Sequence, residues 1–202
     1  MTPESLARML CRDNESCMSD LHELDLLVEK LDAIAEEEAE GLEVDSLEPP
    51  LLAHVRDIKS IQDRLRSQTG NDEIALYIIR RALYKKYRHT VTSEITGYRC
   101  PICGQPPTLL FYRKTDEGLY TGMMPQARCN CGAEWRIENE WTCPSCMSNG
   151  RGAFKILVSS STGLEVRICR KCGFKMAVAR DASGDLHRLH LYTNIILEAV
   201  EA

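Results

Sequence analysis

Residues 128–146 read RCNCGAEWRIENEWTCPSC and contain two of the four cysteine pairs found in the second half of the chain. Three pairs have the spacing C-x-x-C, whereas only Asn130 separates Cys129 from Cys131. A C-x-x-C turn, called a knuckle here, brings two thiolates to adjacent corners of a tetrahedron around a metal ion, and two facing knuckles complete the site. The short second pair is therefore a defective knuckle, a redox pair or a working variant.

The intervals between the pairs predict which of them share a metal ion. The first and second pairs are separated by 25 residues and the third and fourth by 22, enough for a hairpin, whereas 11 residues separate the second from the third. Each unit repeats the order knuckle, strand, glycine turn, strand, knuckle, as a tandem duplication would. Sequential pairing predicts a first site of Cys100, Cys103, Cys129 and Cys131, and a second of Cys143, Cys146, Cys169 and Cys172.

The sulfur ligands limit the chemistry of these sites. Four thiolates suit zinc and iron alike, so we expect two Zn²⁺ or two iron ions (Fe²⁺/Fe³⁺), with zinc favoured. A closed four-cysteine site leaves no position for water, so it does not predict hydrolysis. The alternative to metal binding is that the cysteines act as redox dithiols. Metal binding can supply on the order of 10 kcal/mol of folding free energy to units of this size. Because a one-residue loop cannot make the usual turn, the first site is predicted to be the more labile.

Composition and charge indicate a globular protein with two unlike parts. Hydrophobic residues make up 44% of the chain and the net charge is −5, which argues against non-specific phosphate binding by the whole molecule. Residues 1–95 hold 12 Lys/Arg against 20 Asp/Glu, and residues 96–202 hold 13 against 10. The sequence suggests no signal peptide and no membrane helix, so a cytoplasmic protein without a membrane partner is expected. Thiols stay reduced in that compartment, and Cys11 and Cys17 are interpreted as ordinary helix residues.

Residues 1–95 are predicted to be helical. Thr2-Pro3-Glu4 is typical of a helix start, and apolar residues recur at three- and four-residue steps within 19–39 and again within 51–65. Asn71 or Asp72 is predicted to cap a further helix. These amphipathic helices suggest an antiparallel bundle.

From residue 98 onward, short apolar runs alternate with turns. Strands are predicted at 108–112, 156–158 and 164–168, with turns at 116–118 and 161–163. A short terminal helix is predicted to begin at Thr193 or Asn194. His187 and His190 have no second pair of soft ligands, so a surface or strand position is expected for them.

The second half also resembles the formate dehydrogenase accessory protein family, FdhE. The resemblance covers roughly residues 98–200 and rests on the CPICG knuckle, the pair followed by Glu134-Trp135, and the two later pairs leading into a helical tail. It identifies the chain as a short or divergent member, with C-x-C where the family has C-x-x-C. It implies a helical domain (1–95), a first rubredoxin-like module (96–140) and a second with a C-terminal helix (141–202), an α+β fold.

The resemblance implies a non-enzymatic assembly factor that binds the catalytic subunit of formate dehydrogenase or a related metalloenzyme; a homo-oligomer is left open. One alternative is a zinc-ribbon protein that binds nucleic acid, with Arg167, Arg170, Lys171 and Lys175 as a basic cluster. Tyr112, Trp135 and Phe174 would then stack on bases, although the overall acidity argues against this reading. The other alternative is a rubredoxin-like redox protein that contains iron.

Overall fold

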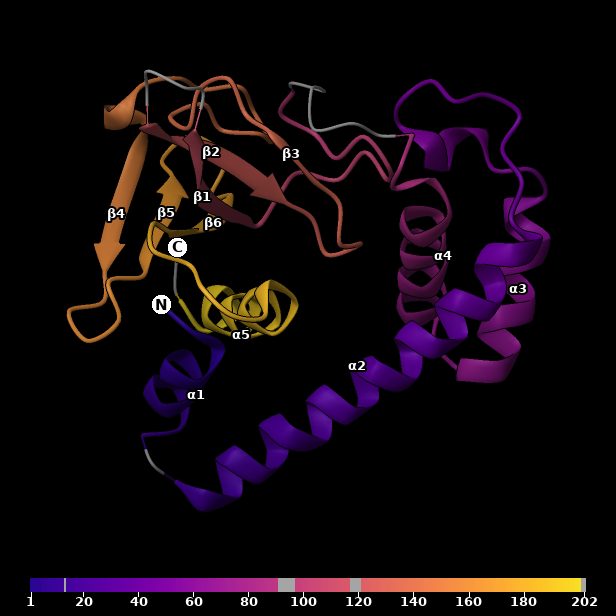
Figure 1. Ribbon diagram of the computed structural model, residues 1–202, viewed down its shortest axis with the longest axis horizontal. Coiled ribbons are helices and arrows are strands. Elements are labelled where there is room, and N and C mark those ends of the chain that lie inside the picture. Colours follow the sequence, from indigo (N-terminus) through magenta and orange to yellow (C-terminus); the bar gives the residue numbers. More distant parts are fainter. Residues whose placement is uncertain (13, 91–96, 117–120, 201–202) are drawn as a thin grey trace.

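The computed structural model describes residues 1–12, 14–90, 97–116 and 121–200 (Figure 1). An α+β fold is confirmed: helices dominate the first part and strands the second, followed by a C-terminal helix. The predicted domain boundary at 95–96 and most of the predicted turn at 116–118 lie outside the described residues. The elements in chain order are α1 (Pro3–Cys11), α2 (Glu15–Gly41), the 3-10 helix η1 (Leu51–His54), α3 (Ile58–Thr69), α4 (Asp72–Tyr87), β1 (Leu109–Asp116), β2 (Thr121–Arg128), β3 (Glu134–Arg136), the 3-10 helix η2 (Arg151–Ala153), β4 (Phe154–Val158), β5 (Glu165–Cys169), β6 (Lys175–Ala179) and α5 (Leu186–Ala199).

Side-chain caps start helices α1, α2, α4 and α5, in two cases where the sequence predicts them. Thr2 caps α1 by accepting a hydrogen bond from the backbone N–H of Ser5, and Asn71 caps α4. The predicted C-terminal helix is confirmed, but its predicted start is wrong, because α5 begins seven residues before Thr193. Asp185 caps it by accepting from two backbone N–H groups, and Thr193 lies buried inside the helix.

The two predicted modules contribute strands to one sheet. Among the described residues the strand order is β3-β2-β1-β6-β5-β4, so β1 to β3 come from the first module and β4 to β6 from the second. The two halves join where β1 pairs with β6 in parallel, with Leu109 opposite Ala177. All other strand pairs in the sheet are antiparallel.

Alternation along the central strands gives the sheet two buried faces. On β6, Met176 and Val178 pack into one hydrophobic core with α3 and α4, whereas Ala177 and Ala179 pack into a second core with α1 and α5. Successive side chains of a strand point to opposite faces, so strands buried on both faces need apolar residues at successive positions. The sheet therefore lies between two groups of helices.

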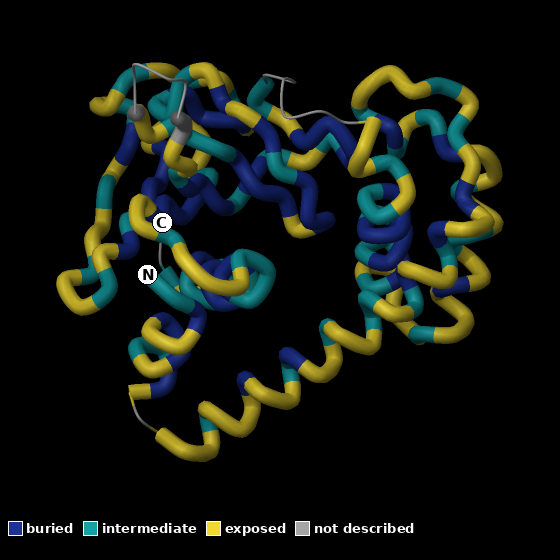
Figure 2. The backbone as a smooth tube through the Cα atoms, in the orientation of Figure 1, coloured by how far each residue is buried: buried dark blue, intermediate teal, exposed yellow. Residues whose placement is uncertain are grey.

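Helix α2 connects the two groups. Its 27 residues span about 40 Å at the usual helical rise. Leu21 near its start lies in the core with α1 and α5, and Ala35 and Ala39 near its end lie in the core with α3 and α4. Figure 1 shows α2 running from α1 to α3 and α4. The helices of the predicted antiparallel bundle do pack together, since α2 and α3 both contact α4, but only the second half of α2 contributes buried residues to their core. Figure 2 shows exposed residues along much of α2.

None of the described helices is long and apolar enough to cross a bilayer.

Candidate metal centres

The structure brings the eight predicted cysteine ligands together in the two predicted groups. In each group the four sulfur atoms lie within 4.8 Å of one another. Across the first cluster the Sγ–Sγ separations are 3.5 Å for Cys100–Cys131 and 3.4 Å for Cys103–Cys129. A tetrahedral ion with metal–sulfur bonds of about 2.3 Å would hold its ligands about 3.8 Å apart. The first cluster therefore has room for one such ion.

The second cluster has the same arrangement. The Sγ–Sγ separations are 3.7 Å for Cys143–Cys172 and 3.6 Å for Cys146–Cys169. As in the first cluster, each of these contacts joins a cysteine of one knuckle to a cysteine of the other, so the knuckles face each other. The two clusters could therefore bind two metal ions, one each.

Backbone hydrogen bonds show how the C-x-C pair replaces a C-x-x-C knuckle. In each C-x-x-C knuckle the carbonyl of the first cysteine accepts from the N–H four residues later, as Gly104 donates to Cys100 at 2.8 Å. In the C-x-C pair Gly132 donates to Cys129 at 2.8 Å, a step of three residues. The turn is shortened by one residue, yet both sulfurs still reach the cluster. The pair therefore keeps the hydrogen-bonded turn of a knuckle with one residue fewer, and both of its sulfurs lie where a shared metal ion could bind them.

The residue after each pair adopts a left-handed backbone. Glycine fills three of these positions, with φ values between 72° and 96°, and Met147 fills the fourth with a φ of 61°. A side chain is unfavourable at such a position. Met147 is therefore the strained member of the set.

The two clusters differ in how deeply their cysteines are buried. All four cysteines of the first are buried, whereas in the second Cys146 is half-buried and Cys172 is exposed. All four cysteines of the first cluster lie in the larger hydrophobic core with residues of α3 and α4, whereas only Cys143 and Cys169 of the second cluster are among its buried residues. Solvent therefore reaches the second cluster much more easily.

Helix α4 holds the shortened pair in place. Arg81 donates from Nη1 to the carbonyl oxygen of Cys131 at 3.0 Å, and its guanidinium also forms an ion pair with Asp32 of α2. A Cβ atom on Gly132 would lie 2.9 Å from Cε1 of Tyr84 and would overlap Nη1 of Arg81. The backbone of η1 also contacts the first knuckle, because Leu52 N–H donates to the carbonyl of Ile102 at 2.8 Å. The helical region thus encloses the first cluster.

Burial disfavours the ionised form of thiols in both clusters, whereas hydrogen bonds from the neighbouring cysteines lower the pKa of Cys103 and a hydrogen bond with Ser148 lowers that of Cys146. Burial raises the pKa of Cys131 well above its ordinary value and raises the pKa of Cys143 to about 12. A thiol must lose its proton to become a good metal ligand, and a divalent ion offsets the cost of the buried negative charge. A divalent ion in each cluster would therefore favour the deprotonated form of the four sulfurs around it.

The two histidines of the tail occupy a helix, contrary to the predicted surface or strand position. Both lie on α5, and His190 is 2% exposed. His190 Nε2 lies 2.7 Å from Oγ1 of Thr108, whose hydroxyl also donates to Asn194 at 2.8 Å. Asn194 in turn donates to the side-chain oxygen of Asn130, the residue inside the C-x-C pair, at 2.8 Å. Sequence reasoning missed this connection because Asn130 is distant from α5 along the chain.

Cys11 and Cys17 form a disulfide, so their interpretation as ordinary helix residues is wrong. Their Cα atoms lie 5.3 Å apart. Helix α1 ends at Cys11, Arg12 adopts a left-handed backbone and α2 begins at Glu15, so the chain changes direction between the two cysteines. On one continuous helix, residues six apart would not share a face. The break between α1 and α2 removes that constraint and lets the two side chains meet.

The proposed basic cluster is not a free surface patch. Arg167 is fully buried, and Lys175 Nζ donates to the carbonyl oxygens of Leu197 and Val200 near the end of α5. Trp135, expected to stack on bases, is also fully buried. These contacts remove two of the four basic residues and one of the three aromatic residues from the nucleic-acid hypothesis.

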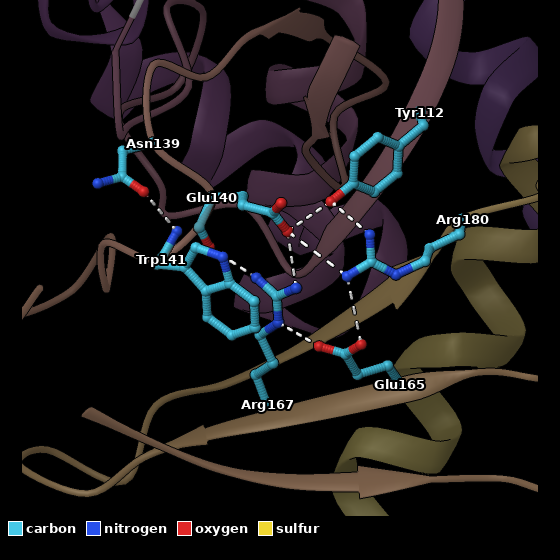
Figure 3. Close-up of polar contacts among 7 residues, drawn as sticks. All are labelled: Tyr112, Asn139, Glu140, Trp141, Glu165, Arg167 and Arg180. Atoms are coloured by element: carbon cyan, nitrogen blue, oxygen red, sulfur yellow. Dashed lines mark hydrogen bonds and ion pairs between the residues drawn. The ribbon is translucent and has the colours of Figure 1, made fainter. Parts of the chain in front are cut away.

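Arg167 instead lies at the centre of a polar cluster where the two modules meet (Figure 3). The Arg167 cluster comprises Tyr112, Asn139, Glu140, Trp141, Glu165, Arg167 and Arg180. Arg167 donates from Nη2 to the Glu140 carboxylate at 2.7 Å, forms an ion pair with Glu165, and lies 3.6 Å from the centroid of the Trp141 ring. Because Glu140 also accepts from Tyr112 of β1, the cluster joins strands of both modules.

Fold and site together define an α+β protein with two four-cysteine clusters. The chain is similar to a solved structure, the FdhE protein from Pseudomonas aeruginosa, at 17% identity and with a TM-score of 0.46. The match covers 68% of this chain and 53% of that protein, so the chain spans about half of its length. No protein-family model matches the chain, and no curated protein matches it.

Proposed function

We propose that this protein is a non-enzymatic accessory factor whose two four-cysteine clusters hold structural metal ions and whose outer surface binds a client protein. The observation that carries the proposal is the closure of both clusters by four cysteines each. Four sulfur ligands fill the positions of a tetrahedral ion and leave none for water or substrate. The ions would fix the knuckles and the sheet in place, and the function would lie in the surface that they stabilise.

The order of the cysteine pairs supports a particular client. The four-pair series with Trp135 resembles the formate dehydrogenase accessory family, and on that basis the client is the catalytic subunit of formate dehydrogenase or of a related metalloenzyme. Binding would take place in the cytoplasm, the compartment that the sequence predicts for this chain.

The free edge of β4 is the surface that we assign to the client. β4 is at the end of the sheet, and among the described strands it pairs only with β5. Leu157 and Val158 on this strand are 39% and 64% exposed. An edge strand presents unpaired backbone donors and acceptors, which an extended segment of a partner can pair with.

A pull-down with matched variants tests the client assignment. The tagged protein is expected to retain the formate dehydrogenase catalytic subunit from the same organism, and Val158→Asp is expected to weaken retention at least tenfold. Leu47→Asp is the control, because Leu47 is 59% exposed but lies between α2 and η1, in the helical region. Normal formate dehydrogenase activity in a deletion strain would overturn the assignment, as would equal retention by the two variants.

Metal analysis tests the role of the clusters. Two equivalents of metal per chain are expected, falling to one in a Cys100→Ser/Cys103→Ser variant. Colourless protein with zinc would support a structural role. A content below one equivalent in freshly purified protein would contradict metal binding at both clusters.

A redox function is the second candidate, and the exposure of Cys172 favours it for the second cluster. An iron ion beside an exposed sulfur could exchange electrons with a partner, as in rubredoxin-like sites. Visible charge-transfer absorption that bleaches on reduction would support this candidate. Its absence from protein with a full complement of zinc would exclude it.

A further inference from the structure

A basic surface borders the free edge of β4. Residues 141–180 hold seven of the 25 Lys/Arg of the chain but only one of its 30 Asp/Glu. Three of those seven, Lys155, Arg170 and Lys171, are exposed, and among the described residues none of their side chains takes part in an ion pair or a hydrogen bond. Exposed cations without a partner in the protein are free to bind an anionic group of another molecule.

The ladder between β4 and β5 places two of these cations side by side. Lys155 pairs with Ile168, and the backbone N–H of Arg170 donates to the carbonyl of Ala153 at 2.8 Å, which continues the ladder past the end of β5. Lys155 and Arg170 are then diagonal neighbours on one face of the ladder, a relation in which residues lie about 7–8 Å apart. Lys171 follows in the exposed part of the last knuckle. These three residues form the basic face, at the end of β4 nearest the second cluster.

The other end of this edge is apolar. Leu157 and Val158 are 39% and 64% exposed, and among the described strands only β5 pairs with β4. Figure 1 shows β4 at the outer side of the sheet, on the opposite side of the molecule from α3. The edge thus offers unpaired backbone groups along its length, cations at its start and apolar side chains at its end. An extended polypeptide segment can match all three features at once.

Nucleic acid matches the same surface less well. Its bases stack on exposed aromatic rings, and the aromatic residues within 141–180 are Trp141, Phe154 and Phe174. Phe154 is buried, Phe174 packs against the larger core, and the Trp141 ring is covered by Arg167. The second cluster does not cancel the basic face either. A divalent ion would offset half of the charge of four thiolates, and the three free cations exceed what is left.

We propose that the client segment that pairs with β4 is an extended strand with acidic residues at one end, over the basic face, and alternating apolar residues at the other, over Leu157 and Val158. This inference rests on the proposed function, because it describes the chemistry of the client at the edge assigned above. The carboxylates bind Lys155, Arg170 and Lys171, while the backbone of the segment pairs with β4. A basic segment is repelled, so charge selects among strands that could otherwise pair with this edge.

Capped peptides test the inference in the metal-loaded full chain. The acidic probe has three glutamates followed by Val-Thr-Val-Thr-Val, and its counterpart has three lysines instead; both are also made in reversed order, because a strand can add in either direction. At low salt, the acidic probe in at least one order is expected to bind about tenfold more tightly than its lysine counterpart, and added salt should reduce the difference. Amide hydrogen exchange of β4 should slow on binding. No binding, equal binding of both probes, or unchanged exchange at β4 would overturn the inference.

Charge-reversed variants with equal net charge locate the site. Lys155→Glu/Arg170→Glu is expected to weaken binding of the acidic probe at least tenfold. Lys30→Glu/Lys59→Glu alters exposed lysines of α2 and α3 and should leave binding unchanged. Metal analysis checks that each variant holds as much metal as the wild type. If Arg170→Glu disturbs the knuckle, Lys155→Glu alone is compared with Lys59→Glu alone.

Two further outcomes would count against the acidic segment. Equal effects of the matched variants would show that net charge alone controls binding. Tighter binding of a single-stranded oligonucleotide than of the acidic probe would assign the basic face to nucleic acid. The probes carry no formate dehydrogenase sequence, so their failure would overturn this inference alone, whereas the pull-down separately decides the client.

Discussion

Gly132 is the residue on which the contact between the first cluster and α4 most depends. Its φ of 96° disfavours any side chain, and a Cβ atom there would overlap Arg81 and Tyr84. Arg81 cannot move away freely, since it is bonded to Asp32 and to the Cys131 carbonyl. We expect Gly132→Ala to lower the free energy of unfolding by about 3–5 kcal/mol, the sum of backbone strain and overpacking. Denaturant unfolding of the metal-loaded protein measures it.

Gly150→Ala is the matched control for Gly132→Ala. Gly150 has a φ of 95°, and a Cβ atom there would meet nothing within 4 Å. Only the backbone cost then applies, about 1–3 kcal/mol, because a φ of 95° with a ψ of 152° is a conformation that side chains disfavour. If the two variants lose equal stability, the close packing of α4 against the C-x-C turn contributes nothing.

At Met147, a substitution to glycine is expected to stabilise the protein. It is 54% exposed and occupies the left-handed position that glycine fills in the other three pairs. We expect Met147→Gly to raise the free energy of unfolding by about 1 kcal/mol, because the backbone strain outweighs the added freedom of glycine in the unfolded chain. Met147→Ala keeps the strain and removes the same side chain, so it should not stabilise. A gain from alanine as large as that from glycine would attribute the effect to the side chain.

At the residue scale, the sequence predicted what spacing and local chemistry determine. The grouping of eight cysteines follows from intervals that fit two hairpins, and the caps at Thr2 and Asn71 follow from short-range hydrogen bonding. The Cys11–Cys17 disulfide and the link from Asn130 to α5 depend on a helix break and on tertiary packing. Neither has a local signature.

Among the elements, the knuckles differ in how much of the fold covers them. The sequence predicted the first site to be the more labile because of its short loop. Burial argues for the opposite order, since the first cluster is enclosed by helices and Cys172 of the second is exposed. We expect a chelator to remove the two metals in two phases, with the faster phase belonging to the second cluster. Both phases are measured by following the absorbance of a chromophoric chelator in a stopped-flow experiment.

Variants assign those phases to the clusters. Cys172→Ser should accelerate or abolish the fast phase and leave the slow phase intact, whereas Cys100→Ser should remove the slow phase. Indistinguishable rates, or a slow phase lost with Cys172→Ser, would show that burial does not control metal release.

The Arg167 cluster predicts how the contact between the modules responds to acid. Burial opposes ionisation of Glu140, but hydrogen bonds from Tyr112 and Arg167 outweigh it and hold the pKa of this carboxyl below its ordinary value of 4.5. A depressed pKa in the folded state gives stability that is complete above about pH 4.5 and is lost as the pH falls through the folded value. The stability difference between the wild type and Glu140→Gln should therefore shrink below pH 4.5.

Urea unfolding of both proteins between pH 6 and pH 3.5 measures that difference. Acid also releases metal from thiolates, but this affects both proteins and cancels in the comparison. A difference that stays constant through pH 4 would show that Glu140 ionises normally.

For the whole molecule, the sequence predicted the parts but not how they join. Amphipathic periodicity and turn signals identified helices and hairpins because both are local patterns. The parallel pairing of β1 with β6 connects residues more than 60 positions apart, and no periodicity records it. Likewise, the apolar residues that recur along α2 form one continuous helix face in the sequence, although the two ends of that face lie in different cores.

These connections predict that the chain unfolds as one unit. The sheet crosses the modules, α2 joins both cores, and the first cluster is enclosed by the helical region. We therefore expect a single denaturant transition for the metal-loaded protein, with the helical signal in circular dichroism and the fluorescence of Trp135 and Trp141 changing together. A fragment of residues 96–140 should not fold around zinc, because its strand β1 would lose β6 and its knuckles would lose α4. Separate transitions for the two signals, or a folded fragment, would establish independent domains at the predicted boundaries.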